Sequence, residues 1–199
     1  DPPLFDRGSM DLVETIEAAG IVPLEPRANY VTVRGPVTMG GPNGSFLTFL
    51  PAEGDSPRLV LDCAVDFPSA IGKQRIRFAV NRDTFRRGAP ARTNTTLAMM
   101  LYCKTIGLLF ADARNMGYTT RNILVAGPYR YFNEPRMVHN GKSLEAAWHR
   151  AALDLLAAIA LIDRGRLAGT VISYKSGHDL DVRMIRELYH RSLLRDMPV

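Results

Sequence analysis

The feature that most constrains the fold is a strand-rich run between Tyr30 and Val80, which is followed by helical segments. Its apolar or alternating stretches are separated by turn sequences, among them Gly-Gly-Pro-Asn-Gly and Glu-Gly-Asp-Ser-Pro. Period-two alternation indicates strands, and clusters of glycine and proline indicate turns. We expect antiparallel strands joined by turns over 30–39, 45–52, 58–67 and 74–80.

The rest of the chain alternates between helical and strand patterns. Apolar residues at helical spacing predict helices over 9–19, 95–107 and 143–163, and a C-terminal helix that contains 180–188. Short apolar runs predict strands over 123–126, 129–132 and 171–174. Strands followed by helices and a returning strand predict an α+β protein, with an antiparallel or mixed sheet and helices packed on one face as a two-layer sandwich.

Composition limits the class of protein. With 199 residues, of which 46% are hydrophobic, the chain can bury a full core as one domain or as one domain with an appendage. No apolar run approaches the roughly 20 residues that span a bilayer, so we expect no membrane span. Cys63 and Cys103 lie in apolar surroundings, which favours buried thiols in a reducing, cytoplasmic compartment. The opening "DPPLFDRGSM" lacks an initiator methionine and suggests the remainder of a longer chain.

The net charge of +5 comes almost wholly from arginine, which suits recognition of phosphate or carboxylate. The densest basic stretch, "NRDTFRRGAPART" at 81–93, could meet a nucleotide phosphate, an anionic membrane surface or RNA. It could equally be a solvated turn and helix face, because acidic residues are interspersed and no aromatic series accompanies the arginines. Nucleic-acid binding therefore ranks low.

His178 lies where a predicted strand meets the C-terminal helix, in the sequence "SYKSGHDL". Loops at strand ends present working groups, and Gly177 permits a sharp turn or the close approach of a ligand. The alternative is an ordinary helix start with Ser176 or Asp179 as the N-cap.

Several segments together resemble one known family. "YKSGH" at 174–178 resembles a signature near the C-terminus of UDP-3-O-acyl-N-acetylglucosamine deacetylase, the zinc amidohydrolase of lipid A biosynthesis. "DRGSMDLVETIEAAGI", "LDCAVDFPSAIGKQRIRFAVNRDTFRRGAPART" and "EAAWHR" resemble further family segments in the same order. The resemblance implies a ribosomal-S5-domain-2-like fold. Residues 1–24 would then be a remnant of the first-domain C-terminal helix, and residues 25–199 the second domain.

The resemblance also implies roles for individual residues. His178 matches the general acid, which stabilises the oxyanion and protonates the leaving amine. Lys175 would face the nucleotide diphosphate, and Arg150 matches a substrate-binding lysine. His149 matches a zinc ligand, and Thr93 a threonine that helps to position water. The implied cofactor is Zn²⁺, which polarises the acetamide carbonyl.

Asp154 departs from the family spacing, in which an aspartate follows the zinc-binding histidine by four residues on one helical face. Here the separation from His149 is five, an offset near 140° on an α-helix, so one straight helix cannot aim both side chains at one metal. A π-bulge could restore convergence. An unbroken helix would instead place Leu153 at the aspartate position and Ala157 at that of the family's second aspartate.

A second departure concerns the Glu-His pair of the family's first domain, which supplies the general base and another zinc ligand. None of the four histidines follows a glutamate. A catalytic zinc normally has three protein ligands, and on the unbroken-helix alignment this chain offers one, so the cofactor could be absent. His149 could then be a partly buried residue hydrogen-bonded to Glu145.

Three functions follow from these observations. The first is a divergent or partial deacetylase, inactive as an isolated chain and completed by a partner chain or a missing first domain. The second is a non-catalytic module that binds a UDP-sugar, an acyl chain or a protein. The third is a basic nucleic-acid-binding domain.

Overall fold

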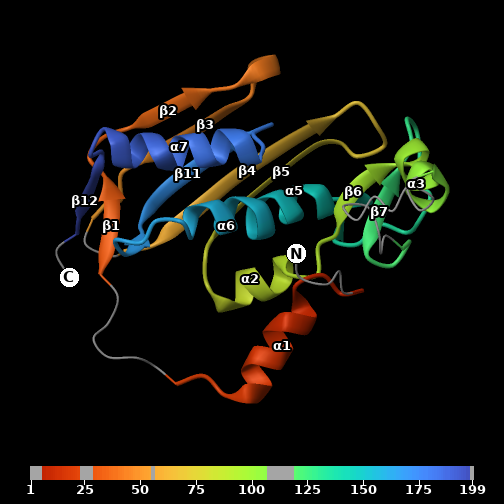
Figure 1. The fold of residues 1–199 in the computed structure, drawn as a ribbon, viewed down its shortest axis with the longest axis horizontal. Coiled ribbons are helices and arrows are strands. Elements are labelled where there is room, and N and C mark those ends of the chain that lie inside the picture. Colours follow the sequence, from red (N-terminus) through yellow and green to blue (C-terminus); the bar gives the residue numbers. More distant parts are fainter. Residues whose placement is uncertain (1–5, 23–28, 55–56, 107–118, 198–199) are drawn as a thin grey trace.

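The computed structural model describes residues 6–22, 29–54, 57–106 and 119–197. Its centre is a five-stranded sheet with the order β2-β3-β11-β4-β5. These strands are β2 (Val37–Gly40), β3 (Phe46–Leu50), β4 (Leu59–Phe67), β5 (Gly72–Ala79) and β11 (Gly169–Tyr174). Figure 1 shows helices on one face of this sheet, so the α+β class expected from the sequence is confirmed.

The expected run of consecutive antiparallel strands is only partly right. β2 pairs with β3 and β4 pairs with β5, both antiparallel, but β3 and β4 do not pair with each other. β11 lies between them, antiparallel to β3 and parallel to β4. A parallel neighbour needs a long crossover, and here the crossover from β4 to β11 contains the long helix over 145–159, whereas the helix over 178–190 follows β11.

The helices begin with α1 (Met10–Ala19) and α2 (Arg82–Gly88). The long helix predicted over 143–163 consists of three consecutive segments: α5 (Glu145–His149), a π-helical segment (Arg150–Leu155) and α6 (Leu156–Ile159). α7 (His178–His190) is the C-terminal helix. The inner faces of these last helices and of the sheet form one apolar core, in which Phe49, Leu61, Leu155, Met184 and Leu188 are almost completely buried.

Smaller strands occupy the two ends of the molecule. At one end, β1 (Tyr30–Val33) lies between β10 (Arg166–Leu167) and β12 (Leu194–Asp196). At the other end are β6 (Thr93–Thr96), α3 (Leu97–Lys104) and β7 (Ile123–Ala126), as Figure 1 shows. The remaining elements are a 3₁₀ turn (Pro42–Gly44) and the hairpin of β8 (Val138–His139) and β9 (Lys142–Ser143).

Three sequence predictions need correction or fall outside this description. The strand expected over 129–132 is a single bridge between Ala126 and Tyr131. The helix expected from Thr95 begins at Leu97, because residues 95–96 continue β6 beside β7, and its expected end at Gly107 lies outside the described residues. The expected boundary between residues 24 and 25 also lies outside them.

A buried ion pair attaches the start of α5 to the loop before β6. The Arg92 side chain is 3% exposed and that of Glu145 is fully buried, with Arg92 Nε 2.7 Å from Glu145 Oε1. The same carboxylate accepts hydrogen bonds from the backbone N–H groups of Arg92 and Arg136, at 3.0 and 2.7 Å. This carboxylate is the counter-charge of the buried Arg92 guanidinium, so its removal would leave that guanidinium without an ion-pair partner.

We expect Glu145→Ala to lower the free energy of unfolding by about 3–5 kcal/mol, the usual effect of breaking a buried ion pair. Glu187→Ala is the matched control, because it removes a surface contact with Arg191 and should cost less than about 1 kcal/mol. Urea unfolding followed by circular dichroism measures both. Equal losses in the two variants would contradict the structural role given to Glu145.

Candidate functional site

A small cavity lies where the end of β4, the loop before α7 and the α5–π helix meet. Its volume is about 190 Å³. Its lining brings together five residues that the sequence had singled out, namely Thr93, His149, Arg150, Asp154 and Lys175. Val65, Asp66, Phe67, Asn94, Ala146 and Ser176 complete the lining.

The π-helical segment decides the direction of Asp154. Hydrogen bonds in a π-helix run from residue i to i+5, so five residues make about one turn. Asp154 therefore returns to the side of His149, with Asp154 Oδ1 3.4 Å from His149 Nε2. The unbroken helix expected over 143–163 was wrong, and the π-bulge considered as the alternative is present. The extra residue that follows His149 is accommodated inside the helix.

His149 makes a contact that the sequence did not predict. Its Nδ1 lies 3.2 Å from the carbonyl oxygen of Ala91, whereas Glu145, the expected partner, accepts hydrogen bonds from Arg92. A carbonyl oxygen can only accept, so this hydrogen bond requires a proton on Nδ1. Nε2 is then the nitrogen that faces Asp154. A backbone carbonyl that orients a histidine in this way is a common feature of metal ligands.

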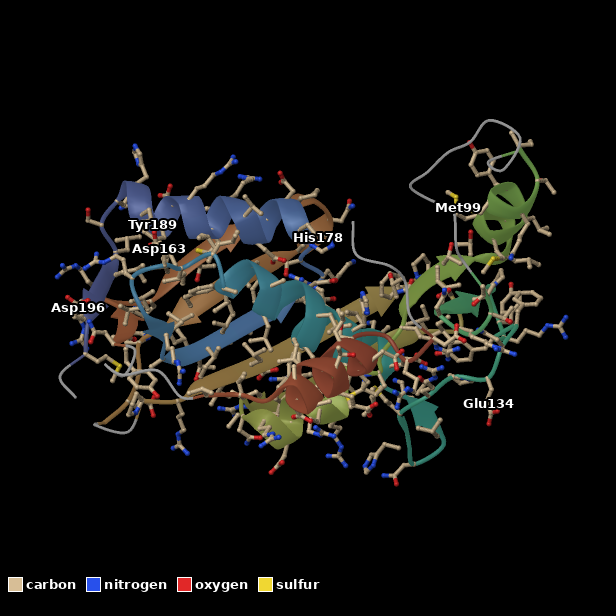
Figure 2. The ribbon with its side chains drawn as sticks, turned by 60° about the horizontal axis from the view of Figure 1, so that its bottom comes forward. Met99, Glu134, Asp163, His178, Tyr189 and Asp196 are labelled. Carbon is tan, nitrogen blue, oxygen red and sulfur yellow. The ribbon has the colours of Figure 1, made fainter. Side chains whose placement is uncertain are left out.

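His178 is the first residue of α7, and Figure 2 shows it at one end of that helix. Its Nε2 lies 3.8 Å from Asp154 Oδ1, while its side chain is 77% exposed. The alternative of an ordinary side-chain cap by Ser176 or Asp179 is not what forms, because Gly177 is the N-cap and no side chain caps the helix. At the other end of α7, the Tyr189 hydroxyl donates to Asp163 Oδ1 at 2.5 Å.

Asp154 lies between these two imidazoles and is held as a carboxylate. Burial by itself would raise its pKa, but the hydrogen bond with His149 and the charges of His149, His178 and Arg150 outweigh burial. The pKa of Asp154 is therefore lower than its ordinary value. An ionised carboxylate beside imidazole nitrogens is the form in which aspartate binds a metal ion.

Arg150 lines the cavity and also belongs to a buried polar network. It forms an ion pair with Asp181, and its Nη2 donates to Ser176 Oγ at 2.8 Å. Its side chain is 7% exposed and that of Asp181 is 1% exposed. Arg150 Nε and Nη1 and Asp181 Oδ2 have no hydrogen-bond partner. Asp181 carries no motif in the sequence, because an acidic residue in the first turn of a helix normally indicates only a favourable interaction with the helix N-terminus.

Lys175 and Thr93 reach the cavity from two different strands. Lys175 follows β11 and has a positive φ of 51°, a conformation that carries strain for a lysine, while its backbone N–H donates to Ala64 at 2.9 Å. Its ammonium lies 5.9 Å from the centre of the Tyr174 ring. Thr93 begins β6 opposite Ile123 of β7.

The donor set fits part of a zinc site. His149 and Asp154 offer nitrogen and oxygen, the donors that zinc accepts, from one face of one helix. Within the described ranges, no group of three or more histidine, cysteine, aspartate or glutamate side chains could hold a metal ion. The described residues thus bring together one nitrogen and one oxygen donor, whereas a catalytic zinc normally has three protein ligands.

These features define an α+β protein in which a His–Asp pair lines one cavity and a second histidine lies close to the aspartate. The family model described as LpxC, UDP-3-O-acyl N-acetylglycosamine deacetylase, matches residues 1–190. The chain belongs to this deacetylase family, as its sequence motifs had suggested. No helix among the described residues is long and apolar enough to cross a membrane.

Two curated relatives carry the name UDP-3-O-acyl-N-acetylglucosamine deacetylase. The protein of Syntrophotalea carbinolica is 28% identical over 187 residues, which are 94% of this chain and 56% of the relative. The protein of Thermosynechococcus vestitus is also 28% identical over 187 residues, which are 59% of its length. The chain therefore spans little more than half the length of these relatives.

Deleting Leu153 tests the π-helical segment. One residue fewer converts a π-turn to an α-turn without rotating the flanking helices, so we expect the variant to fold and to keep its histidine and aspartate adjacent at a spacing of four. Deleting Val182 from the regular helix α7 is the control. It would rotate Met184, Ile185 and Leu188 by about 100° and should abolish cooperative unfolding. Loss of folding in the Leu153 deletion would contradict the π-turn.

The lowered pKa of Asp154 predicts how the free energy of unfolding depends on pH. Its ionised form stabilises the fold above the unfolded-state pKa of about 3.9, and this contribution is lost as the pH falls through the lower folded-state value. We therefore expect Asp154→Asn to be less stable than wild type at pH 5.5, and the difference to shrink as the pH falls below the unfolded-state pKa of about 3.9. Chemical unfolding at several pH values measures it, with Asp179→Asn as the surface control. A difference that does not shrink between pH 5.5 and pH 3 would be inconsistent with this origin.

Proposed function

We propose that this chain provides the second-domain part of a divergent zinc-dependent deacetylase acting on a UDP-3-O-acyl-N-acetylglucosamine-type substrate. The observation that carries the proposal is the π-turn, because it directs Asp154 back to His149 despite the departure from the family spacing. Membership of the family and the printed name of both relatives support the substrate class.

In this proposal His149 and Asp154 hold two positions on Zn²⁺, through Nε2 and a carboxylate oxygen. Zinc supplies a Lewis acid that polarises the amide carbonyl of the substrate. His178, which is exposed and lies 3.8 Å from Asp154 Oδ1, carries the proton for the leaving amine. Lys175 attracts the diphosphate, and the hydroxyl of Thr93 orients water at the cavity wall.

Arg150 contributes to substrate binding indirectly in this scheme. A guanidinium that is paired with Asp181 and nearly buried supports the loop that carries Lys175 and His178. Direct contact with substrate would require this pair to separate, which leaves a buried charge uncompensated.

The third zinc ligand and the general base come from outside the described residues. The family supplies both from its first domain, so we propose a partner chain or a further segment with a Glu-His pair, and a cytoplasmic setting for the assembly. The 199-residue chain alone is then inactive. A non-catalytic module that binds UDP-sugar or acyl groups is the second candidate, and it is favoured by the absence of a three-ligand group among the described residues.

Zinc titration distinguishes these candidates. We expect the 199-residue protein to bind one Zn²⁺ by calorimetry, and His149→Ala and Asp154→Asn each to weaken binding by at least tenfold, because each removes one of only two ligands. His190→Ala is the matched control and removes an exposed histidine near the C-terminal end of α7. Equal affinity in all four proteins would exclude the His149–Asp154 pair and favour the module.

A deacetylase assay tests the proposal that the isolated chain lacks part of the active site. The isolated chain should release no acetate from UDP-3-O-acyl-N-acetylglucosamine, and activity should appear when a chain carrying the first domain of a relative is added. Hydrolysis by the isolated chain, abolished by His178→Ala and by chelation, would contradict the need for a partner.

A further inference from the structure

The basic stretch at 81–93 is mostly neutralised by internal ion pairs. Arg82 and Arg86 both bind the carboxylate of Glu17 on α1. Arg92 binds Glu145 in the core. The remaining cation, Arg87, lies exposed at the end of α2 and forms no ion pair within the described part of the chain.

Arg87 lines a cavity of about 390 Å³ at the edge of the sheet, beside the outermost strand β5. The other walls are β5, the 137–139 segment and the start of the long helix. This cavity shares no lining residue with the candidate deacetylase site. Its lining consists of Arg75, Ile76, Arg77, Arg87, Met137, Val138, His139, Leu144 and Trp148.

The ionisable residues that line this cavity are all basic. Arg77 on β5 and Arg87 on α2 have no acidic partner among the described residues, and no carboxylate lines the cavity. Arg75 is already held by both oxygens of Asp62, at 2.7 Å each. Two arginines without acidic partners, on separate elements that line one cavity, favour a phosphate or carboxylate, which their planar guanidinium groups recognise well.

Part of the cavity wall is apolar. Ile76, Leu144 and Trp148 form part of it, and the Trp148 ring stacks on Phe78 with centroids 4.7 Å apart. A cavity of a few hundred Å³ that combines apolar walls with a few polar groups is typical of small-molecule sites. A volume of this size suits a single ring better than a continuous polymer.

We propose that this cavity binds a small amphipathic anion, a phosphate or carboxylate attached to one apolar ring, with Arg77 and Arg87 holding the anion and Trp148 contacting the ring. The proposal is independent of the deacetylase function. It rests on the two unpaired arginines, the apolar wall and the cavity volume.

Trp148 is the one tryptophan of the chain, so its fluorescence reports directly on this cavity. We would titrate the 199-residue protein with phenyl phosphate, benzoate, phenol and inorganic phosphate. Phenyl phosphate or benzoate should change the fluorescence saturably. Phenol and inorganic phosphate should each bind at least tenfold more weakly, because each lacks one half of the ligand.

The variants Arg77→Ala and Arg87→Ala should each weaken binding of the anionic ring by at least fivefold, with urea unfolding midpoints like that of the wild type. Arg186→Ala is the control, because it removes an exposed arginine of α7 far along the chain from the cavity. Equal binding by all three variants would overturn the proposal, as would equal affinity for inorganic phosphate and phenyl phosphate.

Binding to anionic phosphatidylglycerol vesicles and to single-stranded poly(U) tests whether the two arginines serve a membrane surface or RNA and not a small ligand. Binding to either that depends on Arg77 and Arg87, without saturable binding of phenyl phosphate or benzoate, would replace the small-ligand proposal with a surface interaction. These arginine variants should bind zinc as the wild type does. Loss of ligand binding in this cavity is therefore measured separately from loss of zinc binding at the candidate deacetylase site.

Discussion

The buried ion pair between Arg150 and Asp181 joins the two elements on which the candidate site depends. Arg150 belongs to the π-helical segment, and Asp181 lies in the first turn of α7. Both side chains are almost completely removed from water, so separating them would leave a buried charge, at a cost of about 3–5 kcal/mol. Through this pair and Ser176, the position of His178 relative to Asp154 is tied to the core. Three polar atoms of the pair lack hydrogen bonds, which is consistent with a role in positioning more than in stability.

The same helix carries a second buried charge near its beginning. Glu145 binds Arg92 and the backbone of Arg136, and so fixes the start of α5 against the segment that leads into β6. His149 lies between these two anchors, with Nδ1 directed at Ala91. The π-helical segment begins at the second anchor, Arg150, and ends at Leu155. The apolar residues on both sides of it remain packed in the core.

Much of the fold could be predicted from local patterns, because alternation and helical spacing report burial directly. The strands around Leu61 and Val171 and the helix containing Met184 were placed correctly. The insertion of β11 between β3 and β4 was not, since strand order depends on contacts between segments more than one hundred residues apart. For the site, the motif "YKSGH" and the family resemblance led to the residues around the cavity. They could not predict Asp181 or Ala91, which carry no motif of their own.

The sequence by itself determined the class of fold, the family and the short set of polar residues that deserved testing, because these follow from periodicity and from motifs. It left two conformations open for the helix after His149, an unbroken α-helix and a bulged one, since spacing alone does not say where an extra residue is accommodated. Only the tertiary structure decided between them. Rotating Leu155 and Ile159 out of the core would cost several kcal/mol of apolar burial, whereas one π-turn keeps both inside and returns Asp154 to His149.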